Sequence, residues 1–211
     1  MILKARNLKK WFERPQKVEV LRGIDLTVEA GTSVAIMGTS GEGKSTLLHI
    51  LGTLEAPTEG TLEIAGEPNP TPELRNQKIG FVFQAFNLLE DYTVLQNVMM
   101  PALIAGKRDE KRALKLLERV GLLHRASFPA KLLSGGEKQR VAIARAFCND
   151  PAIIMADEPS GNLDHDTSQL IHKLLLECVK EEGKALIVVT HDTELAKLCD
   201  KTYQLINGEL K

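Results

Sequence analysis

Short β-type runs and amphipathic helical stripes alternate along most of this chain. The β-type runs lie at residues 18–21, 24–28, 33–37, 61–64, 79–83, 152–156, 185–189 and 203–206. Gly31 and Gly60 mark turns among the first of them. Residues 153–155 and 186–189 are apolar without interruption, which is typical of strands that are covered on both faces. The pattern predicts an α/β fold.

Helical periodicity governs the segments between these runs. One short helix is expected at residues 44–51, with Gly52 at its C-cap, and residues 88–149 are mainly helical. Two apolar stripes are expected to face the core, the first made of Ala113, Leu116, Leu117 and Val120 and the second of Leu170, Ile171, Leu174, Leu175 and Cys178. No repeat or linker divides the sequence, so residues 1–211 are predicted to form one domain in which residues 88–149 are a helical lobe.

Composition narrows the functional classes. The formal net charge is −1 and the basic residues are spread along the chain, which does not favour a nucleic-acid partner. Cys148, Cys178 and Cys199 lack metal or redox spacing and are expected to be buried, reduced thiols. The sequence shows no signal peptide and no run of the roughly 20 apolar residues that a membrane span needs. We therefore expect a soluble chain, so any membrane part must come from another polypeptide.

A glycine-rich segment follows the run at 33–37 and precedes the expected helix. It fits the pattern G-x-x-x-x-G-K-[ST] and consists of Gly38, Thr39, Ser40, Gly41, Glu42, Gly43, Lys44, Ser45 and Thr46. Such a loop points backbone N–H groups inward, and the helix N-terminus adds partial positive charge, so together they bind phosphate. We expect Lys44 to reach the β- and γ-phosphates of a nucleotide and Ser45 to ligate Mg²⁺.

Asp157 and Glu158 directly follow the apolar run at 152–156. They are placed where open α/β sheets bind ligands, at the carboxyl end of a strand. We expect Asp157 to hold Mg²⁺ and Glu158, pointing to the other side of the strand, to activate water as a general base. An acidic pair here could also cap a helix or face solvent, so the assignment depends on the phosphate loop upstream.

The segment 133–140 is the most specific motif in the sequence. Ser134 and Glu137 satisfy S-x-x-E, a capping box that begins a helix. Gly135 and Gly136 are not explained by capping, because a glycine in a helix costs roughly 0.5–1 kcal/mol relative to alanine. Glycines here instead permit close approach of a phosphate to the helix N-terminus.

With these motifs the chain resembles the ATPase subunits of ABC transporters, whose signature is LSGGQ or LSGGE followed by a Gln-Arg pair. The resemblance covers nearly the whole chain. It implies a P-loop NTPase of ABC type, with a RecA-like core, an antiparallel β subdomain and a helical signature subdomain near residues 88–149. It also implies that two copies sandwich ATP and Mg²⁺, with Ser134, Gly135 and Gly136 of one copy facing the P-loop nucleotide of the other.

The same resemblance assigns further site residues. It implies that Phe12 stacks on adenine, although Trp11 lies beside it, and that Gln84 senses Mg²⁺ and the attacking water. Asp164 matches a loop that acts across the dimer, and His191 matches the histidine that bonds the γ-phosphate. Glu42 departs from the small residue usual at its position, and if it points inward it should repel phosphate modestly. His49, His124, His165 and His172 share no metal-ligand pattern, so we expect them to be structural.

Within the family the sequence is similar to the branch that contains the ATPases of the lipoprotein-releasing transporter, the macrolide exporter and the cell-division complex. Residues 83–89, 97–98, Pro101 and 159–164 indicate the branch, and residues 74–81 favour the lipoprotein-releasing member. This implies a peripheral subunit on the cytoplasmic side of the inner membrane, bound to an integral membrane permease. The apolar residues Phe86–Leu89, Tyr92, Val94 and Leu95 are expected near the groove for that permease.

Functions of other classes remain open from the sequence. A P-loop kinase or regulatory switch would bind nucleotide in the same way, but neither function would require the motif at residues 133–140. A soluble ABC-type ATPase acting on DNA or ribosomes usually carries two cassettes or basic surfaces, and this sequence has neither.

Overall fold

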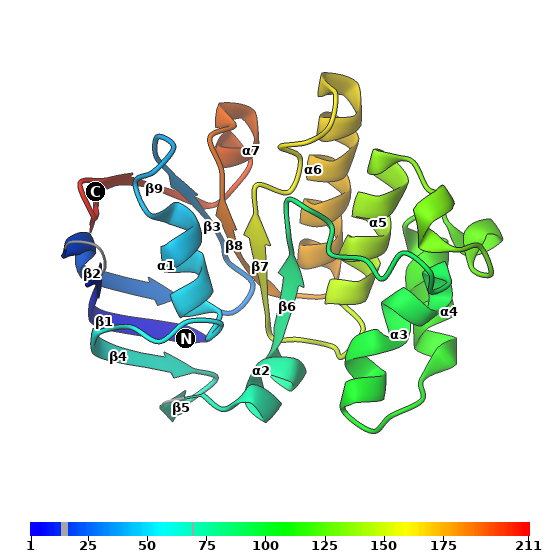
Figure 1. Cartoon of the computed structure of the whole chain (residues 1–211), viewed down its shortest axis with the longest axis horizontal. Coiled ribbons are helices and arrows are strands. Elements are labelled where there is room, and N and C mark those ends of the chain that lie inside the picture. The colour runs from blue at the N-terminus through cyan, green and yellow to red at the C-terminus, as the bar shows by residue number, and fades with distance from the viewer. Residues whose placement is uncertain (14–16, 69) are drawn as a thin grey trace.

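The structure, a computed structural model, describes residues 1–13, 17–68 and 70–211. Its strands form two sheets (Figure 1). The antiparallel sheet has the order β2-β1-β4-β5 and consists of β1 (Leu3–Phe12), β2 (Val18–Val28), β4 (Glu59–Ile64) and β5 (Glu67–Pro68). The larger sheet has the order β10-β9-β3-β8-β7-β6 and consists of β3 (Ser33–Met37), β6 (Ile79–Val82), β7 (Ile153–Asp157), β8 (Ala185–Val189), β9 (Lys201–Ile206) and β10 (Glu209–Leu210). All neighbours in the larger sheet run parallel except β10 and β9.

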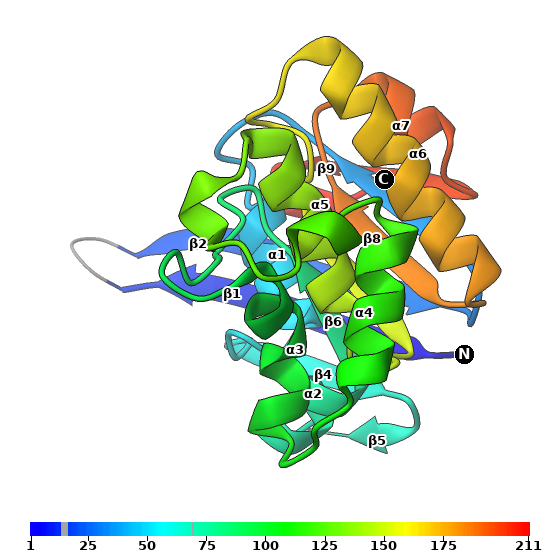
Figure 2. The same ribbon diagram turned by 90° about the vertical axis from the view of Figure 1, so that its right-hand side faces the viewer.

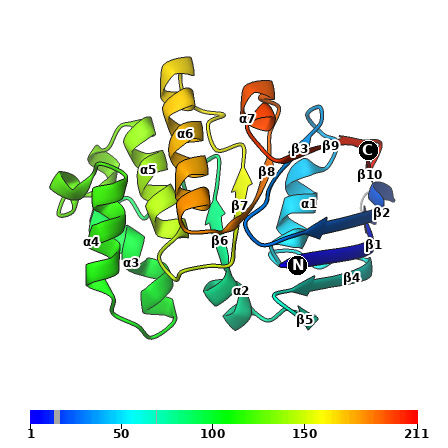
Figure 3. The same cartoon turned by 180° about the vertical axis from the view of Figure 1, so that it is seen from behind.

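The helices fall into groups around the larger sheet. They are α1 (Lys44–Leu51), α2 (Pro72–Lys78), α3 (Val94–Ile104), α4 (Glu110–Arg119), α5 (Gly135–Ala146), α6 (His165–Glu181) and α7 (Thr193–Lys197), with 3₁₀ turns at Leu123–Arg125 and Ala130–Leu132. Helices α3, α4 and α5 lie together on one side of the molecule, opposite the antiparallel sheet (Figures 1 and 2). Helix α6 lies between α5 and α7 (Figure 3). Among the described residues, no helix combines the length and apolar character needed to cross a bilayer.

The apolar strands of the larger sheet are buried on both faces, as their sequences predict. Alternate residues of one strand enter different clusters: Ile153 and Met155 pack with α1 and the antiparallel sheet, whereas Ile154 and Ala156 pack toward α3–α6. Strand β8 divides in the same way. Because successive side chains of a strand point to opposite faces of the sheet, one continuous apolar run supplies both hydrophobic clusters.

The runs at 18–21 and 24–28, expected as separate strands, form the single strand β2. Gly23 lies between them with φ 98°, and the pairing register with β1 shifts there, from Leu8 opposite Ile24 to Lys9 opposite Arg22. A glycine bulge lets the strand continue at the point where the sequence pattern predicts a turn.

The two apolar stripes differ in how well they were predicted. In α4, Ala113, Leu116 and Leu117 are buried, and the helix ends just before Gly121, which has φ 72°. In α6 the expectation was wrong for Leu170, which is 63% exposed. Cys199 was also expected to be buried and is only half-buried, although all three thiols are free.

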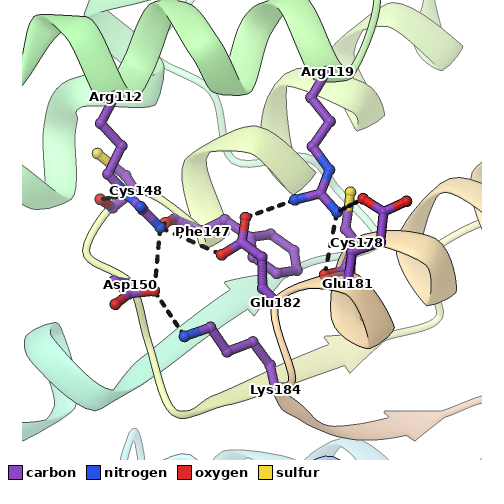
Figure 4. Close-up of polar contacts among 9 residues, drawn as sticks. All are labelled: Arg112, Arg119, Phe147, Cys148, Asp150, Cys178, Glu181, Glu182 and Lys184. Carbon is purple, nitrogen blue, oxygen red and sulfur yellow. Dashed lines mark hydrogen bonds and ion pairs between the residues drawn. The ribbon is translucent and has the colours of Figure 1, made fainter.

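An ion-pair cluster joins α4 to the carboxyl end of α6 (Figure 4). The Arg119 guanidinium lies 2.6 Å from Glu182 and 2.5 Å from Glu181. Arg112 donates at 2.9 Å to the carbonyls of Phe147 and Cys148, just beyond α5. The cluster therefore ties α4 both to α6 and to the end of α5.

Candidate active site

The phosphate loop curls because two of its glycines occupy conformations that other residues rarely adopt. Gly41 and Gly43 have φ 87° and 94°, in the left-handed region. A Cβ on Gly43 would lie 2.5 Å from Val20 Cγ1, and one on Gly38 would lie 2.7 Å from the Leu205 carbonyl oxygen. Both the dihedral angles and the close neighbours thus require glycine, and the loop ends where α1 begins at Lys44, as predicted.

The Lys44 side chain folds back along this loop. Its Nζ donates to the carbonyl oxygens of Gly38 at 2.8 Å and Thr39 at 3.0 Å, and the residue is only 9% exposed. The ammonium is therefore fixed at the mouth of the loop, together with the N-terminus of α1.

A cavity of about 770 Å³ opens beside the loop. It brings together residues that are far apart in the sequence: the phosphate loop, Gln84 after β6, Glu158 after β7 and His191 after β8. These strand ends meet because β3, β8, β7 and β6 are parallel neighbours. Of the expected site residues, its lining includes Thr39, Ser40, Gly41, Gly43, Lys44, Ser45, Thr46, Gln84, Glu158 and His191.

Asp157 faces the phosphate loop from the end of β7. Its Oδ1 accepts a hydrogen bond from Ser45 Oγ at 3.1 Å, and its Oδ2 lies 4.0 Å from His49 Nε2. Burial raises the pKa of the Asp157 carboxyl above its ordinary value, against the hydrogen bond from Ser45. A hydroxyl and a carboxylate side by side are the oxygen ligands that suit Mg²⁺. Within the described part of the chain, no group of three or more His, Cys, Asp or Glu is placed to hold a metal by itself.

Glu158 is oriented by its own backbone conformation and not by the alternation of a continuing strand. It lies beyond the end of β7 with φ 43°, and its N–H donates to the Val189 carbonyl at 3.0 Å. Its Oε1 lies 2.9 Å from His191 Nδ1, and its Oε2 accepts from Thr190 Oγ1 at 3.2 Å. The turn brings Glu158 into the same cavity as the phosphate loop.

Gln84 is held by the loop that follows Glu158. Asn162 Nδ2 donates to the Gln84 carbonyl at 2.9 Å, and Gln84 Nε2 donates to Asn162 Oδ1 at 3.4 Å. Farther along, Phe86 and Asn87 both have positive φ, and Arg145 of α5 donates to both of their carbonyls. Burial lowers the pKa of Arg145 to about 10, so the guanidinium remains charged at neutral pH.

Ser134 caps α5 and forms the predicted capping box. Its Oγ accepts from the Glu137 N–H at 3.3 Å, and its own N–H donates to Glu137 Oε2 at 2.9 Å. Packing within the chain also favours glycine at position 136, because a Cβ on Gly136 would lie 2.7 Å from Thr167 Cγ2 of α6. The first turn of α5 therefore packs closely on α6.

The signature residues line a separate cavity of about 340 Å³. Ser134, Gly135, Gly136 and Asp164 lie on it, and it shares no lining residue with the cavity at the phosphate loop. Asp164 caps α6 and accepts from the Thr167 N–H at 3.0 Å. Within one chain, the two predicted phosphate-binding groups thus face different spaces.

A model of the ABC transporter family matches residues 21–161, which span the phosphate loop, the signature and the acidic pair. The chain belongs to the ABC transporter family. It is an ATPase subunit of that family, and the expected α/β fold of ABC type is confirmed.

Individual relatives of this ABC ATPase match over nearly its whole length. The "Lipoprotein-releasing system ATP-binding protein LolD" of Protochlamydia amoebophila is 56% identical, covering 99% of this chain and 95% of that protein. The protein of the same name from Pseudomonas syringae is 48% identical over 99% of this chain and 96% of its own length. The dimeric post-hydrolysis structure of the ATP-binding cassette MJ0796 bound to ADP and Pi is 38% identical, with a TM-score of 0.90 over 100% of this chain and 97% of that one.

Phe12, like the signature residues, lies apart from the cavity at the phosphate loop of this ABC ATPase. It ends β1, is 42% exposed, and has the Lys10 ammonium 5.1 Å from its ring centroid. It does not line the cavity at the phosphate loop as the described residues form it, although Val20 of the same sheet does.

The Glu42 side chain is held by a neighbouring turn. Its Oε2 accepts from the Asn207 N–H at 2.8 Å, so this carboxylate is engaged by the turn between β9 and β10.

The apolar segment after Gln84, expected near a permease groove, is exposed at some positions and buried at others. Tyr92 is 47% exposed, whereas Val94 is fully buried in the core.

Four residues that contact the site were not singled out from the sequence as functional. They are Gln139, Arg145, His172 and Thr190. Gln139, although inside the signature stretch, is fully buried and donates to the Pro159 carbonyl at 2.5 Å. Besides Gln139, Thr190 carries a sequence signal, because it stands beside His191 at a strand end.

Proposed function

We propose that this ATPase powers the release of lipoproteins from a membrane, as a dimer bound to an integral membrane permease. The identity of the proposed cargo is inferred from the relatives, which are named for a lipoprotein-releasing system and match over nearly the whole chain. The observation that carries the ATPase chemistry is the convergence of the phosphate loop, Glu158 and His191 on one cavity.

The phosphate loop binds the triphosphate. Backbone N–H groups from Gly38 to Thr46 and the N-terminus of α1 supply the anion site, and Lys44 adds a charged donor. Ser45 and Asp157, which are hydrogen-bonded to each other, would hold Mg²⁺ together with Gln84. The ion would supply positive charge against the β- and γ-phosphate oxygens. Phe12 stacks on the adenine from the end of β1.

Glu158 acts as the general base and His191 contacts the γ-phosphate. The Glu158 side chain is only 14% exposed, whereas that of His191 is 72% exposed. The carboxylate is therefore held in place, and the imidazole is free to turn toward the nucleotide. Water then attacks the γ-phosphorus while its proton passes to Glu158, and the bond from the γ-phosphorus to the β,γ-bridging oxygen breaks, so that ADP and phosphate are the products.

A second copy completes the site. Ser134, Gly135 and Gly136 sit at a helix N-terminus but face a cavity separate from the phosphate loop of their own chain. They meet a triphosphate if another copy presents its own loop, and Asp164 then lies at the same junction. The dimeric state of the MJ0796 cassette, which is 38% identical to this chain, supports this arrangement.

One ABC-type ATP-binding domain spans residues 1–211, and its helical subdomain covers approximately 88–149. The grouping of α3, α4 and α5 at one side of the molecule supports this division (Figure 2).

The permease docks beside the Gln84 loop, on the cytoplasmic face of the inner membrane. An apolar-walled groove of about 450 Å³ lies there, with Phe81, Phe83, Asn87, Pro101 and Ile104 in its lining. Ile104 is 71% exposed, which is typical of an apolar surface that a partner covers. A short amphipathic helix from the permease would fit this groove.

The proposal is tested with the chain and the membrane protein that co-purifies with it, reconstituted in liposomes that contain a lipid-modified protein. Addition of ATP and Mg²⁺ should release that protein from the liposomes, whereas a Glu158→Gln complex should not. ATP hydrolysis without any release of lipoprotein would contradict the cargo while leaving the ATPase assignment intact. Release that persists in Glu158→Gln would contradict the hydrolytic role.

A further inference from the structure

His172 lies on α6, fully buried, between the loop that follows β7 and the loop that follows β8. Its Nε2 is 2.6 Å from Ser160 Oγ in the first loop. The same nitrogen is 3.8 Å from Asp192 Oδ2 in the second. One buried imidazole thus touches both of the segments that bring acidic and basic groups to the active site.

The surroundings of the ring determine which nitrogen carries its proton. Nδ1 is buried and has no hydrogen-bond partner among the described residues, so a proton there would be a buried unpaired donor. Nε2 faces the Asp192 carboxylate, which favours an N–H at that position. The geometry therefore selects the Nε2–H tautomer, with Ser160 Oγ as acceptor. Burial lowers the pKa of His172 despite the nearby Asp192 and Glu194, so the ring is neutral at neutral pH.

Both neighbours of His172 connect directly to the hydrolytic pair. Ser160 is two residues beyond Glu158, in a tight turn where the Gly161 N–H donates to the Glu158 carbonyl at 3.0 Å. On the other side, the Asp192 N–H donates to Thr190 Oγ1 at 3.0 Å, and that hydroxyl donates to Glu158 Oε2 at 3.2 Å.

Asp192 is itself held rigidly, because it caps α7. Its Oδ1 accepts from the N–H groups of Glu194 at 2.7 Å and Leu195 at 3.1 Å. The second carboxylate oxygen is left for His172. Displacement of the imidazole would therefore leave Ser160 without this anchor and alter the spacing of the two loops.

We propose that His172 is a positioning residue for ATP hydrolysis: from α6 it fixes the two loops that carry Glu158 and His191. The inference rests on the hydrolytic roles proposed above for those two residues. His172 touches neither of them and acts through Ser160 and Asp192.

A pair of amide substitutions separates this role from packing. In His172→Gln the amide nitrogen can occupy the place of Nε2, whereas in His172→Asn it reaches only about as far as Nδ1. The full chain is assayed for ATP hydrolysis across ATP concentrations at saturating Mg²⁺. We expect His172→Asn to lower kcat on the order of tenfold, as loss of an orienting outer contact commonly does, with KM for ATP changed less than about twofold. His172→Gln should retain kcat within about twofold.

Equal losses in the two amide variants, or wild-type kcat in His172→Asn, would overturn the proposal. The same substitution at the exposed His124, a histidine outside the site, is the control and should leave kcat unchanged. If Glu158→Gln is inactive and His172→Asn is fully active, the positioning role of His172 is refuted and the proposed function stands. Activity in Glu158→Gln refutes the proposed function instead.

Ser160→Ala provides a test that does not depend on replacing the ring. It removes only a hydroxyl, so it should fold even if His172→Asn does not. Its kcat should fall, and the double variant with His172→Asn should be no slower than the slower of the two single variants, because both changes act on one contact. Additive losses would contradict the coupling. Nitrogen-15 NMR of labelled histidine gives a direct check, since it should show His172 as the Nε2–H tautomer, and an Nδ1–H signal would refute the geometry.

Discussion

Glu158 and His191 are in direct contact, with Oε1 of the carboxylate 2.9 Å from Nδ1 of the imidazole. The contact joins the segment after β7 to the segment after β8, so the proposed base and the proposed phosphate ligand are directly coupled. Glu158 engages Nδ1 of His191, and Nε2 is the other ring nitrogen, which the proposed mechanism directs to the γ-phosphate. The same contact holds the carboxylate that we propose accepts a proton from water.

Glu158→Gln should lower turnover by at least about 100-fold, the size of effect expected when a general base is removed. ATP binding should be retained, because the phosphate loop is untouched, and light scattering at saturating ATP and Mg²⁺ should detect a dimer. The exposed Glu177→Gln on α6 is the control and should behave as wild type. A monomer under these conditions would count against the proposed sandwich.

Lys44→Ala should weaken ATP binding at least about tenfold. A hydrogen bond to a charged group contributes about 1.5–3 kcal/mol, and about 1.4 kcal/mol corresponds to a factor of ten. Isothermal titration with ATP measures the change, and Lys173→Ala, whose side chain is 74% exposed on α6, serves as the control. Undiminished affinity in Lys44→Ala would refute the phosphate role.

Ser134→Arg should abolish turnover while ATP affinity stays near that of the wild type. The bulky cation fills the helix N-terminus that the partner's nucleotide would meet, but the phosphate loop lies in the other cavity. Ser134→Ala separates this effect from capping, because loss of the cap costs about 1 kcal/mol of stability. Unchanged ATPase activity in Ser134→Arg would exclude the contact between copies.

Arg119→Ala should lower the free energy of unfolding by about 1–2 kcal/mol, since hydrogen bonds to charged groups exceed ordinary ones. Its side chain is only 24% exposed, and its guanidinium bonds both Glu181 and Glu182 at the end of α6 (Figure 4). The matched comparison is Lys173→Ala, which breaks an exposed pair with Glu177 and should cost at most about 0.5 kcal/mol. Urea unfolding measures both, and equal costs would show that the cluster of Figure 4 contributes no more than a surface pair.

The native protein should lose stability as the pH falls below the ordinary histidine value of 6.5, in part because of His172. Burial lowers the pKa of this ring in the folded state, so the unfolded chain binds a proton that the native state resists. Its contribution is complete above the unfolded pKa and decreases below it. Urea unfolding at pH 7.5 and 5.5 should show a smaller difference for His172→Gln than for wild type, and an identical difference would contradict the assignment.

Local patterns in the sequence predicted much of the fold. The glycine spacing gave the phosphate loop and the start of α1 at Lys44, and S-x-x-E gave the capping box of Ser134 and Glu137. Continuous apolar runs gave β7 and β8 as strands buried on both faces. These features depend on residues within a few positions of one another, where backbone geometry alone restricts the outcome.

Tertiary structure decided which of these pieces meet. Ser45 bonds Asp157 across 112 positions, and Arg145 reaches the Phe86 carbonyl across 59, because the order of parallel strands brings their carboxyl ends together. No periodicity marks His172 as different from its apolar neighbours on α6, since burial depends on the elements packed against it. The chain thus encodes the chemistry of each loop locally, whereas the distances between those chemical groups are set by how the strands and helices pack.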